Sequence, residues 1–157
     1  MGAKSTPLPI ALALGLMALS ACGASDNASA PEPPAPAAPA YELTDDTRAA
    51  FAALTGDPTA GRRVFARCSS CHALAPGQNR TGPTLYGVVG RPAGAVEGFR
   101  YSQATQRSGL IWSEAMLFAY LENPSGVING TSMSFIGLAR PQQRADVIAY
   151  IKQESAN

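Results

Sequence analysis

The chain contains the stretch Cys68-Ser69-Ser70-Cys71-His72, in which two thiols stand three positions apart and a histidine directly follows the second thiol. This spacing is the attachment signature of a c-type haem: the thiols form thioether bonds to the porphyrin, and the histidine becomes the proximal ligand of the iron. A zinc site would need two more ligands, yet Cys22 is the only other cysteine and His72 is the only histidine. A thioredoxin-like redox pair would need a βαβ context, which the sequence does not show. The motif therefore predicts one haem c, bound covalently through Cys68 and Cys71.

The N-terminal residues predict export followed by lipid anchoring. Lys4 precedes an apolar run from residue 8 to residue 19, which is too short to span a bilayer comfortably and is typical of a cleaved signal peptide, residues 1–21. The run ends in Leu19-Ser20-Ala21-Cys22, which resembles the bacterial lipobox, whose cysteine is acylated after cleavage. Several acyl chains on Cys22 would anchor the protein stably, whereas an ordinary secretory signal that ends near Cys22 is the alternative. We expect a lipid-anchored protein on the periplasmic side of the membrane of a Gram-negative bacterium.

Two further segments precede the main domain. Residues 22–40 are rich in proline and alanine and cannot bury enough apolar surface to fold, so they predict a semi-extended tether. Such a tether is either a leash between membrane partners or an inert spacer, and both interpretations stay open. Residues 41–55 predict a short acidic helical segment, with Thr44 as its N-cap and with Phe51 and Leu54 packed inward.

Charge separates these segments from the domain that follows. Residues 56–157 carry ten Arg and Lys residues against six Asp and Glu residues, whereas residues 23–55 carry one against five, so the total of +1 hides a basic domain on an acidic stalk. A basic surface steers acidic docking partners toward a protein, although solvated surface cations are an equal explanation. The cations are scattered and no recognition motif accompanies them, so we expect no nucleic-acid partner.

The basic domain predicts three helices. Asp57-Pro58 is an N-cap followed by proline at the first helical position, and the helix that follows runs into the cysteine motif. A second helix is expected over residues 113–122, capped by Ser113 and stopped by Pro124, and a third over about residues 141–151. No stretch alternates for long enough to be a strand, so the fold class is all-α. Three helices and loops make a poor core unless a large apolar body lies at their centre, so we expect folding to be coupled to haem attachment.

Further runs extend the cysteine motif in both directions along the domain. Taken together, they make residues 56–154, about 100 of the 157, resemble a class I cytochrome c of the mitochondrial and alphaproteobacterial kind. The resemblance implies the class I cytochrome c fold, with three or more helices and loops wrapped around one covalently attached haem. The matching runs are residues 61–65, 68–72, 81–87, 90–91, 98–102, 120–124, 130–135 and 144–150.

The second axial ligand of the iron follows from the composition and from the resemblance. With no second histidine, a methionine thioether is the natural candidate, and removal of the signal peptide leaves Met116 and Met133. Met116 lies in an apolar helical pattern and is expected to fill the core, whereas Met133 lies among small polar residues that let the backbone approach the ring. The resemblance also places the ligand at Met133, with Tyr120 and Thr131 as the polar cluster on the same side.

The resemblance gives roles to further residues of the haem surroundings. Pro83 would accept, through its carbonyl, the hydrogen bond from Nδ1 of the proximal histidine and so orient it. Arg91, Tyr101 and Trp112 would donate hydrogen bonds to the haem propionates, which need such donors when they are buried. Aromatic core packing is the alternative for Tyr101 and Trp112. Phe135 would flank the exposed haem edge.

These predictions lead to a single-electron carrier rather than an enzyme, because two filled axial positions leave no coordination site for a substrate. We expect a membrane-tethered, monomeric member of the respiratory chain, with a quinol-oxidising cytochrome bc1-type complex as donor and a terminal oxidase or other reductase as acceptor. The positive charge comes from arginine where the family's docking face is rich in lysine, so no specific partner is carried over. Two alternatives stay open: a peroxidase-like haem enzyme in which Met133 detaches, and a fixed electron-entry subunit of a larger respiratory complex.

Overall fold

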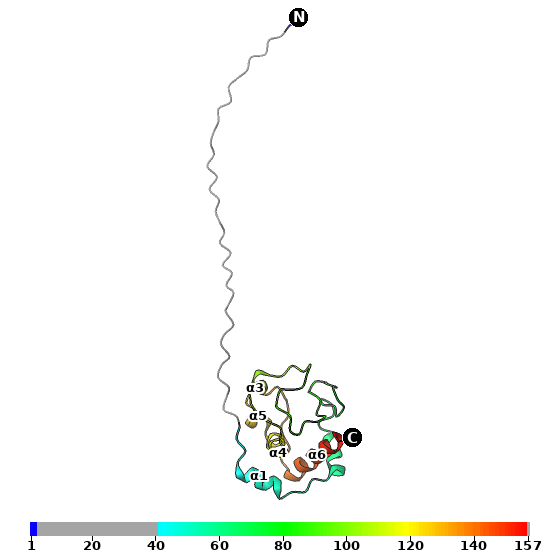
Figure 1. Cartoon of the computed structure of the whole chain (residues 1–157), viewed down its shortest axis with the longest axis vertical. Coiled ribbons are helices and arrows are strands. Elements are labelled where there is room, and N and C mark those ends of the chain that lie inside the picture. Colours follow the sequence, from blue (N-terminus) through cyan, green and yellow to red (C-terminus); the bar gives the residue numbers. More distant parts are fainter. Residues whose placement is uncertain (3–40, 157) are drawn as a thin grey trace. The chain divides into compact units, whose positions relative to one another are not determined.

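The computed structural model describes residues 1–2 and 41–156, so the predicted signal peptide from residue 3 onward, Cys22 and the tether lie outside the described residues. From residue 41 onward the described chain folds into helices joined by long loops (Figure 1), and its only β-type pairing is an isolated bridge between Pro92 and Ile111. The predicted all-α fold class is confirmed. The helices are α1 (Asp45–Ala52), α2 (Pro58–Phe65), α3 (Gln103–Gln106), α4 (Glu114–Glu122), α5 (Pro124–Val127) and α6 (Pro141–Glu154).

Side-chain caps start two of the main helices at their predicted positions. The Asp57 carboxylate accepts a hydrogen bond from the Thr59 N–H at 2.8 Å, and Pro58 opens α2. The Ser113 hydroxyl oxygen accepts one from the Met116 N–H at 3.1 Å and caps α4 in the same way. Each cap satisfies a backbone donor that has no partner within its helix, which explains why the helices begin where they do.

Two four-residue helices, α3 and α5, lie in the connecting segments and were not predicted. Pro124 was predicted to stop the second main helix, and α4 does end just before it, at Glu122. Pro124 also opens α5, because the Asn123 side chain accepts a hydrogen bond from the Gly126 N–H at 3.1 Å and caps a new turn. Proline fits both roles, since its missing N–H breaks a helix interior but costs nothing at a first helical position.

Helices α2 and α6 cross at very short range. A β-carbon at Gly61 of α2 would overlap the backbone carbonyl of Asp146 in α6, so only glycine permits this approach. The rings of Phe65 and Tyr150 pack beside the crossing, with centroids 5.4 Å apart. The Asp146 carboxylate also accepts a hydrogen bond from the Asp57 N–H at 2.9 Å, which ties the start of α2 to α6.

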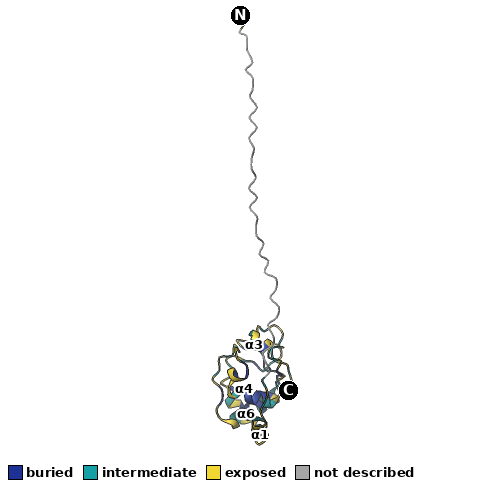
Figure 2. Ribbon diagram, turned by 90° about the vertical axis from the view of Figure 1, so that its left-hand side faces the viewer, coloured by how far each residue is buried: buried dark blue, intermediate teal, exposed yellow. Residues whose placement is uncertain are grey.

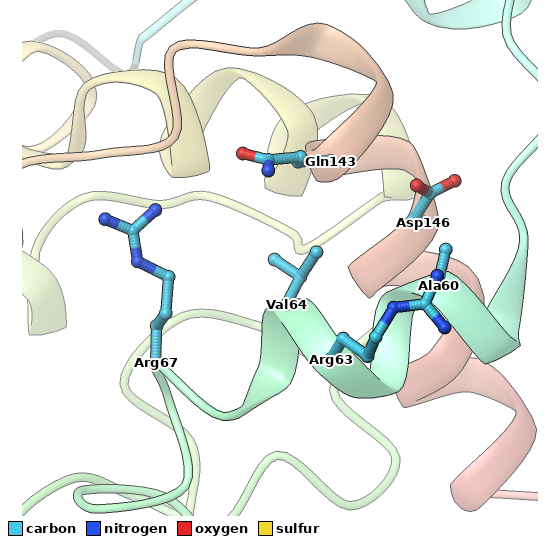
Figure 3. Close-up of a pocket in the computed structure, with 6 residues that line it drawn as sticks. All are labelled: Ala60, Arg63, Val64, Arg67, Gln143 and Asp146. Carbon is cyan, nitrogen blue, oxygen red and sulfur yellow. The ribbon is translucent and has the colours of Figure 1, made fainter.

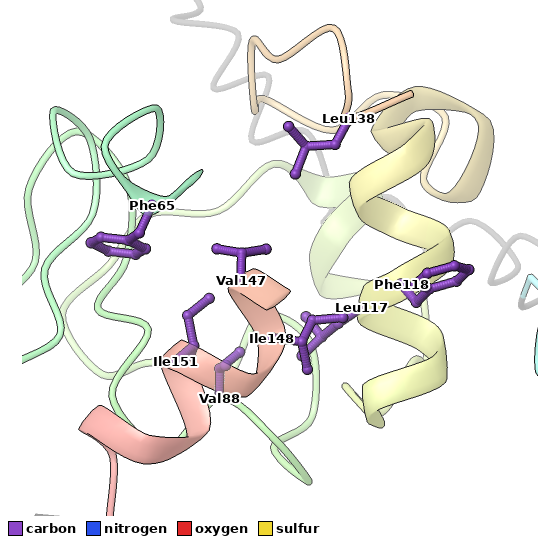
Figure 4. Packing of buried hydrophobic residues seen from close by; sticks show 8 residues of the cluster. All are labelled: Phe65, Val88, Leu117, Phe118, Leu138, Val147, Ile148 and Ile151. Carbon is purple, nitrogen blue, oxygen red and sulfur yellow. The ribbon is translucent and has the colours of Figure 1, made fainter. Parts of the chain in front are cut away.

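The core consists of two clusters, and α4 contributes to both. The buried residues gather on α4 and α6 (Figure 2). Met116 is only 7% exposed within the second cluster, which confirms that it packs in the core. The first cluster contains Phe65, Val88, Leu117, Phe118, Leu138, Val147, Ile148 and Ile151 (Figure 4). The second cluster contains Leu110, Met116, Ala119, Tyr120, Val127 and Ile128.

The predicted helix within residues 41–55 is present as α1. Its N-cap is Thr44, whose hydroxyl oxygen accepts a hydrogen bond from the Thr47 N–H at 3.1 Å. Phe51 and Leu54 pack inward against the first cluster, and the Phe51 ring centroid lies 5.4 Å from that of Phe118. Among the described residues, no helix is both long and apolar enough to cross a membrane.

Candidate haem-binding site

The cysteine motif follows α2 as a series of tight turns. The Cys68 N–H donates to the Phe65 carbonyl at 2.8 Å, and the N–H groups of Cys71 and His72 both donate to the Cys68 carbonyl, at 3.1 Å and 2.9 Å. Cys68 is half-buried and Cys71 is exposed. These turns place the two thiols and the imidazole within one short, internally hydrogen-bonded segment, as attachment to a single porphyrin requires.

The surroundings of Cys68 disfavour a thiolate. Burial raises the pKa of the Cys68 thiol to about 11, while the charge of Arg67 acts in the opposite direction. Redox-active and metal-binding cysteines have a lowered pKa instead. Within the residues that the structure describes, no three His, Cys, Asp or Glu side chains come together as a metal-binding cluster.

His72 is held in one orientation from two sides. Its Nδ1 atom donates a hydrogen bond to the Pro83 carbonyl at 2.7 Å, and Gly82 packs so closely against the ring that a β-carbon there would overlap it. Burial lowers the pKa of His72, and the bond to Pro83 only partly opposes this shift. The neutral ring is therefore favoured, and with Nδ1 engaged, the lone pair of Nε2 is left to coordinate iron. The residues around His72 fit a haem with a histidine ligand. Sequence reasoning gave Gly82 no role, although its place in a matching run was the available signal.

Arg91, Tyr101 and Trp112 come together on another part of the site. The Trp112 N–H donates to the Arg91 carbonyl at 2.9 Å, so the two backbones run side by side. The Arg91 guanidinium donates to the carbonyls of Tyr86 at 2.8 Å and Thr84 at 2.9 Å, which fixes its position and leaves its other N–H groups for a ligand.

The electrostatics of this group suit an anion. Burial lowers the pKa of Arg91, and Tyr101 opposes the shift. Burial also raises the pKa of Tyr101, and the Arg91 charge is among the effects that oppose it. A partly buried cation is stabilised by a negative partner, so a carboxylate such as a propionate fits here. Trp112 packs against both core clusters and its ring centroid lies 4.8 Å from that of Tyr120, so its predicted alternative of core packing is also realised.

A hydrogen bond of its own backbone N–H helps to position Met133. Its N–H donates to the Thr131 hydroxyl oxygen at 3.3 Å, and the same oxygen lies 2.9 Å from the Tyr120 hydroxyl. Tyr120 is buried at 8% exposure, and Met133 is half-buried against the second cluster. The polar pair of Tyr120 and Thr131 therefore fixes the start of the loop that carries Met133.

The return of this loop is fixed by contacts that the sequence did not reveal. The Leu138 N–H donates to the Leu121 carbonyl at 2.7 Å, and Gly137, at a φ of 100°, lies directly against the Glu122 backbone. Arg144, only 3% exposed, donates to the Leu138 carbonyl at 2.7 Å. The loop, residues 130–140, is thus pinned to α4 and α6 at its far end. Arg144 belongs to one of the runs that match the family, but nothing in the sequence predicted that this arginine is buried.

A shallow pocket of about 280 Å³ lies between α2 and α6, outside this site (Figure 3). None of the predicted site residues lines it. The carboxylate of Asp146 is already engaged by the Asp57 N–H and by Gln142, and the side chains of Arg63 and Arg67 are exposed. Arg63 and Arg67 give the rim of the pocket positive charge next to the cysteine motif. Its lining is Ala60, Arg63, Val64, Arg67, Gln143 and Asp146.

Comparison with known proteins identifies the family. The family model Cytochrome c matches residues 58–155. A cytochrome c2 from Rhodomicrobium vannielii is 50% identical over 103 residues, covering 65% of this chain and 82% of the relative, and a cytochrome c2 from Rhodopila globiformis is 45% identical over 98 residues, covering 62% and 92%. The solved structure of cytochrome cH from Methylobacterium extorquens is similar with a TM-score of 0.60 and 42% identity, covering 62% of this chain and 99% of that one. The chain therefore belongs to the cytochrome c family, with the class I cytochrome c fold and one haem c bound covalently through Cys68 and Cys71.

Proposed function

We propose that this cytochrome is a single-electron carrier whose iron is held by His72 and Met133. Two hydrogen bonds support this assignment: His72 Nδ1 to the Pro83 carbonyl at 2.7 Å, and the Met133 N–H to Thr131 at 3.3 Å. Each would hold its ligand in place whatever the oxidation state, so little would have to move when an electron enters or leaves. A haem with histidine and methionine ligands supplies reversible one-electron chemistry at a raised potential.

The remaining site residues would bind the haem without taking part in bond making. Arg91, Tyr101 and Trp112 would hold the propionates, and Tyr120 with Thr131 would keep the loop of Met133 closed. With both axial positions filled by the chain, no position is left for a substrate, and the role of an enzyme is not supported.

We further propose that the protein works at the periplasmic face of the membrane, tethered by acyl chains on Cys22. The donor would be a quinol-oxidising cytochrome bc1-type complex and the acceptor a terminal oxidase or other reductase. Exposed arginines beside the cysteine motif, Arg63 and Arg67 among them, support docking to acidic surfaces of such partners. We expect the protein to act as a monomer that binds no nucleic acid.

The ligation is tested by optical spectra of the oxidised and reduced holoprotein, in wild type, Met133→Leu and Met116→Leu. The wild type should be low-spin with a ferric methionine–iron charge-transfer band, and Met133→Leu should lose that band. Met116→Leu is the matched control, because Met116 is buried in the second cluster, and it should keep the band. A high-spin wild type that binds peroxide or carbon monoxide freely would overturn the carrier and favour the peroxidase-like alternative.

The tether is tested by fractionation of cells that express the wild type or Cys22→Ala with an ordinary secretory signal. The wild type should sediment with the membranes and resist extraction by salt, while Cys22→Ala should appear in the soluble periplasm. Equal solubility of both proteins would contradict lipid anchoring and leave the ligand assignment untouched.

A further inference from the structure

Residues 41–55, which we name the strap, form a part of the domain that the family match does not include. The match begins at residue 58, whereas the strap comprises an extended entry, α1 and the turn toward α2. In Figure 1 it runs as a cyan segment past α5 and α4 to α1. It is therefore an addition to the part of the chain that the family model matches.

The strap is held by one contact within itself and by contacts with α6 at its C-terminal end. The Arg48 guanidinium donates to the Leu43 carbonyl at 3.2 Å, so α1 and the entry hold each other. At the other end, the Gln142 side chain donates to the Thr55 carbonyl at 2.8 Å. A β-carbon at Gly56 would lie 2.5 Å from the Ala145 carbonyl oxygen, so the exit of the strap lies tightly against α6.

The two ends of the strap pack against different clusters. Tyr41 and Leu43, before α1, pack against the second cluster, and Phe51 and Leu54, at the end of α1, pack against the first. All four side chains are half-buried. The strap thus carries two matched pairs, each with one aromatic residue and one leucine, on two separate parts of the core.

The second cluster is also the support of Met133. Met133 packs against it, the cluster member Tyr120 contacts Thr131 at 2.9 Å, and the Thr131 N–H donates to the carbonyl of Ile128 at 3.0 Å. The entry of the strap and Met133 therefore pack against the same cluster. The first cluster, under Phe51 and Leu54, contains Leu138 at the far end of the loop, but neither Tyr120 nor Ile128, which contact Thr131 near Met133.

We propose that the entry of the strap, Tyr41 and Leu43, is a positioning element for Met133. It holds the second cluster in the arrangement that keeps the Met133 loop closed on the iron, and its loss raises the population of the open loop. This proposal rests on the proposed ligation by Met133.

Phe51 and Leu54 pack against the first cluster, which includes Leu138 at the far end of the loop. Leu138 is held there by hydrogen bonds from its N–H to Leu121 and to its carbonyl from Arg144, which changes at Phe51 and Leu54 leave in place. We therefore expect those changes to lower the stability of the whole domain without opening the loop selectively.

Imidazole binding to the ferric holoprotein tests this proposal, because imidazole reaches the iron only when Met133 has left. Its apparent dissociation constant is inversely proportional to the population of the open state. We compare the wild type, Tyr41→Ala/Leu43→Ala and the matched control Phe51→Ala/Leu54→Ala. Global unfolding in guanidinium chloride, followed by far-ultraviolet circular dichroism, is measured on the same samples.

The entry variant should bind imidazole about tenfold more tightly than the wild type, with loss of the methionine–iron band at lower denaturant than global unfolding. The control variant should unfold at lower denaturant but bind imidazole with the affinity of the wild type. Equal imidazole affinity in the entry variant and the wild type, or an equal gain in both variants, would overturn the positioning role. If the double variant does not fold, Leu43→Ala alone carries the same prediction with a smaller gain.

The failure of the proposed ligation has a different signature. A wild type without the methionine–iron band, which binds imidazole as tightly as Met133→Leu does, contradicts ligation by Met133 itself. A wild type with the band and weak imidazole binding, but no response to the entry variant, contradicts only the role of the strap.

Discussion

Gly61 of α2 and Asp146 of α6 meet backbone to backbone, with no room for a side chain between them. This contact sets how closely the two helices approach, and the rings of Phe65 and Tyr150 pack beside it. A glycine inside a helix costs about 1 kcal/mol of helix stability relative to alanine. The close approach of α2 and α6 must outweigh that cost.

Gly61→Ala is therefore expected to destabilise the protein although it favours the isolated helix. The new β-carbon would push α2 away from α6 and lower the free energy of unfolding by about 3 kcal/mol. Denaturant unfolding of the holoprotein measures the change. Ala66→Ser, at the exposed end of the same helix, is the control and should change stability by less than about 0.5 kcal/mol; a neutral Gly61→Ala would show that the crossing is loose.

Gly82→Ala should act on His72 rather than on the core. The added β-carbon would overlap three ring atoms of His72, and the ring cannot turn away without losing its bond to Pro83. We expect weakened histidine ligation, seen as a high-spin component in the ferric spectrum, and a loss of about 2 kcal/mol in the free energy of unfolding. Thr81→Ala, at the exposed neighbouring position, should leave the spectrum unchanged. An unchanged spectrum in Gly82→Ala would contradict the constraint.

Arg144 and Glu122 form an ion pair at 3.4 Å, but their contributions should be unequal. The Arg144 side chain is 3% exposed, bonds the Leu138 carbonyl and lies 4.2 Å from the centroid of the Phe118 ring, whereas Glu122 is 55% exposed. Arg144→Met should lower the free energy of unfolding by about 3 kcal/mol, because the buried carbonyl loses its donor. Glu122→Gln should cost less than about 1 kcal/mol. Equal losses in denaturant unfolding would mean that the ion pair, not the carbonyl bond, is the stabilising contact.

The Tyr120 and Thr131 hydroxyls should be energetically coupled. A double-mutant cycle with Tyr120→Phe and Thr131→Val is expected to give a coupling free energy of about 1 kcal/mol, the usual contribution of one hydrogen bond. Both single variants should also weaken the methionine–iron band, because the Met133 N–H bonds the same oxygen. Additive single effects would show that the two hydroxyls act separately.

The buried phenol of Tyr120 should affect how stability changes at alkaline pH. Burial raises the pKa of Tyr120 above its usual value of 10.0, and the hydrogen bond with Thr131 acts in the opposite direction. A raised folded-state pKa contributes stability that is complete below the unfolded-state pKa and is lost as the pH rises through the folded-state pKa. The stability of Tyr120→Phe should therefore fall less steeply than that of the wild type above about pH 10. Parallel pH profiles of the two proteins in denaturant unfolding would contradict this assignment.

Local signals explain why the main helices were predictable. Asp57 with Pro58, and Ser113, encode helix starts within a few residues, and these starts are present. The helices α3 and α5 have four residues each, which is too short for a periodic pattern, so periodicity could not predict them. Asn123 with Pro124 is nevertheless the same kind of cap and proline that opens α2.

Contacts between distant parts of the chain were harder to predict from the sequence. Helical spacing predicted that Phe51 and Leu54 point inward, but Tyr41 and Leu43 precede α1, and their packing depends on a cluster more than sixty residues later. The burial of Arg144 arises in the same way, from Phe118 and Leu138. For the site, the motif and the resemblance predicted His72, Pro83 and the hydrogen bond between them. The close packing of Gly82 against the His72 ring could be recognised only from the folded loop.

The hydrogen bond from the Asp57 N–H to Asp146 joins residues 89 positions apart, and it stands at the crossing that closes the domain. A chain that emerges from its N-terminus has made Cys68 and Cys71 long before α6 exists to meet α2. Without α6, the burial that Cys68 has in the finished domain is incomplete. Because Cys68 packs against a cluster that includes Val147, Ile148 and Ile151 of α6, its burial is complete only once the last helix has docked.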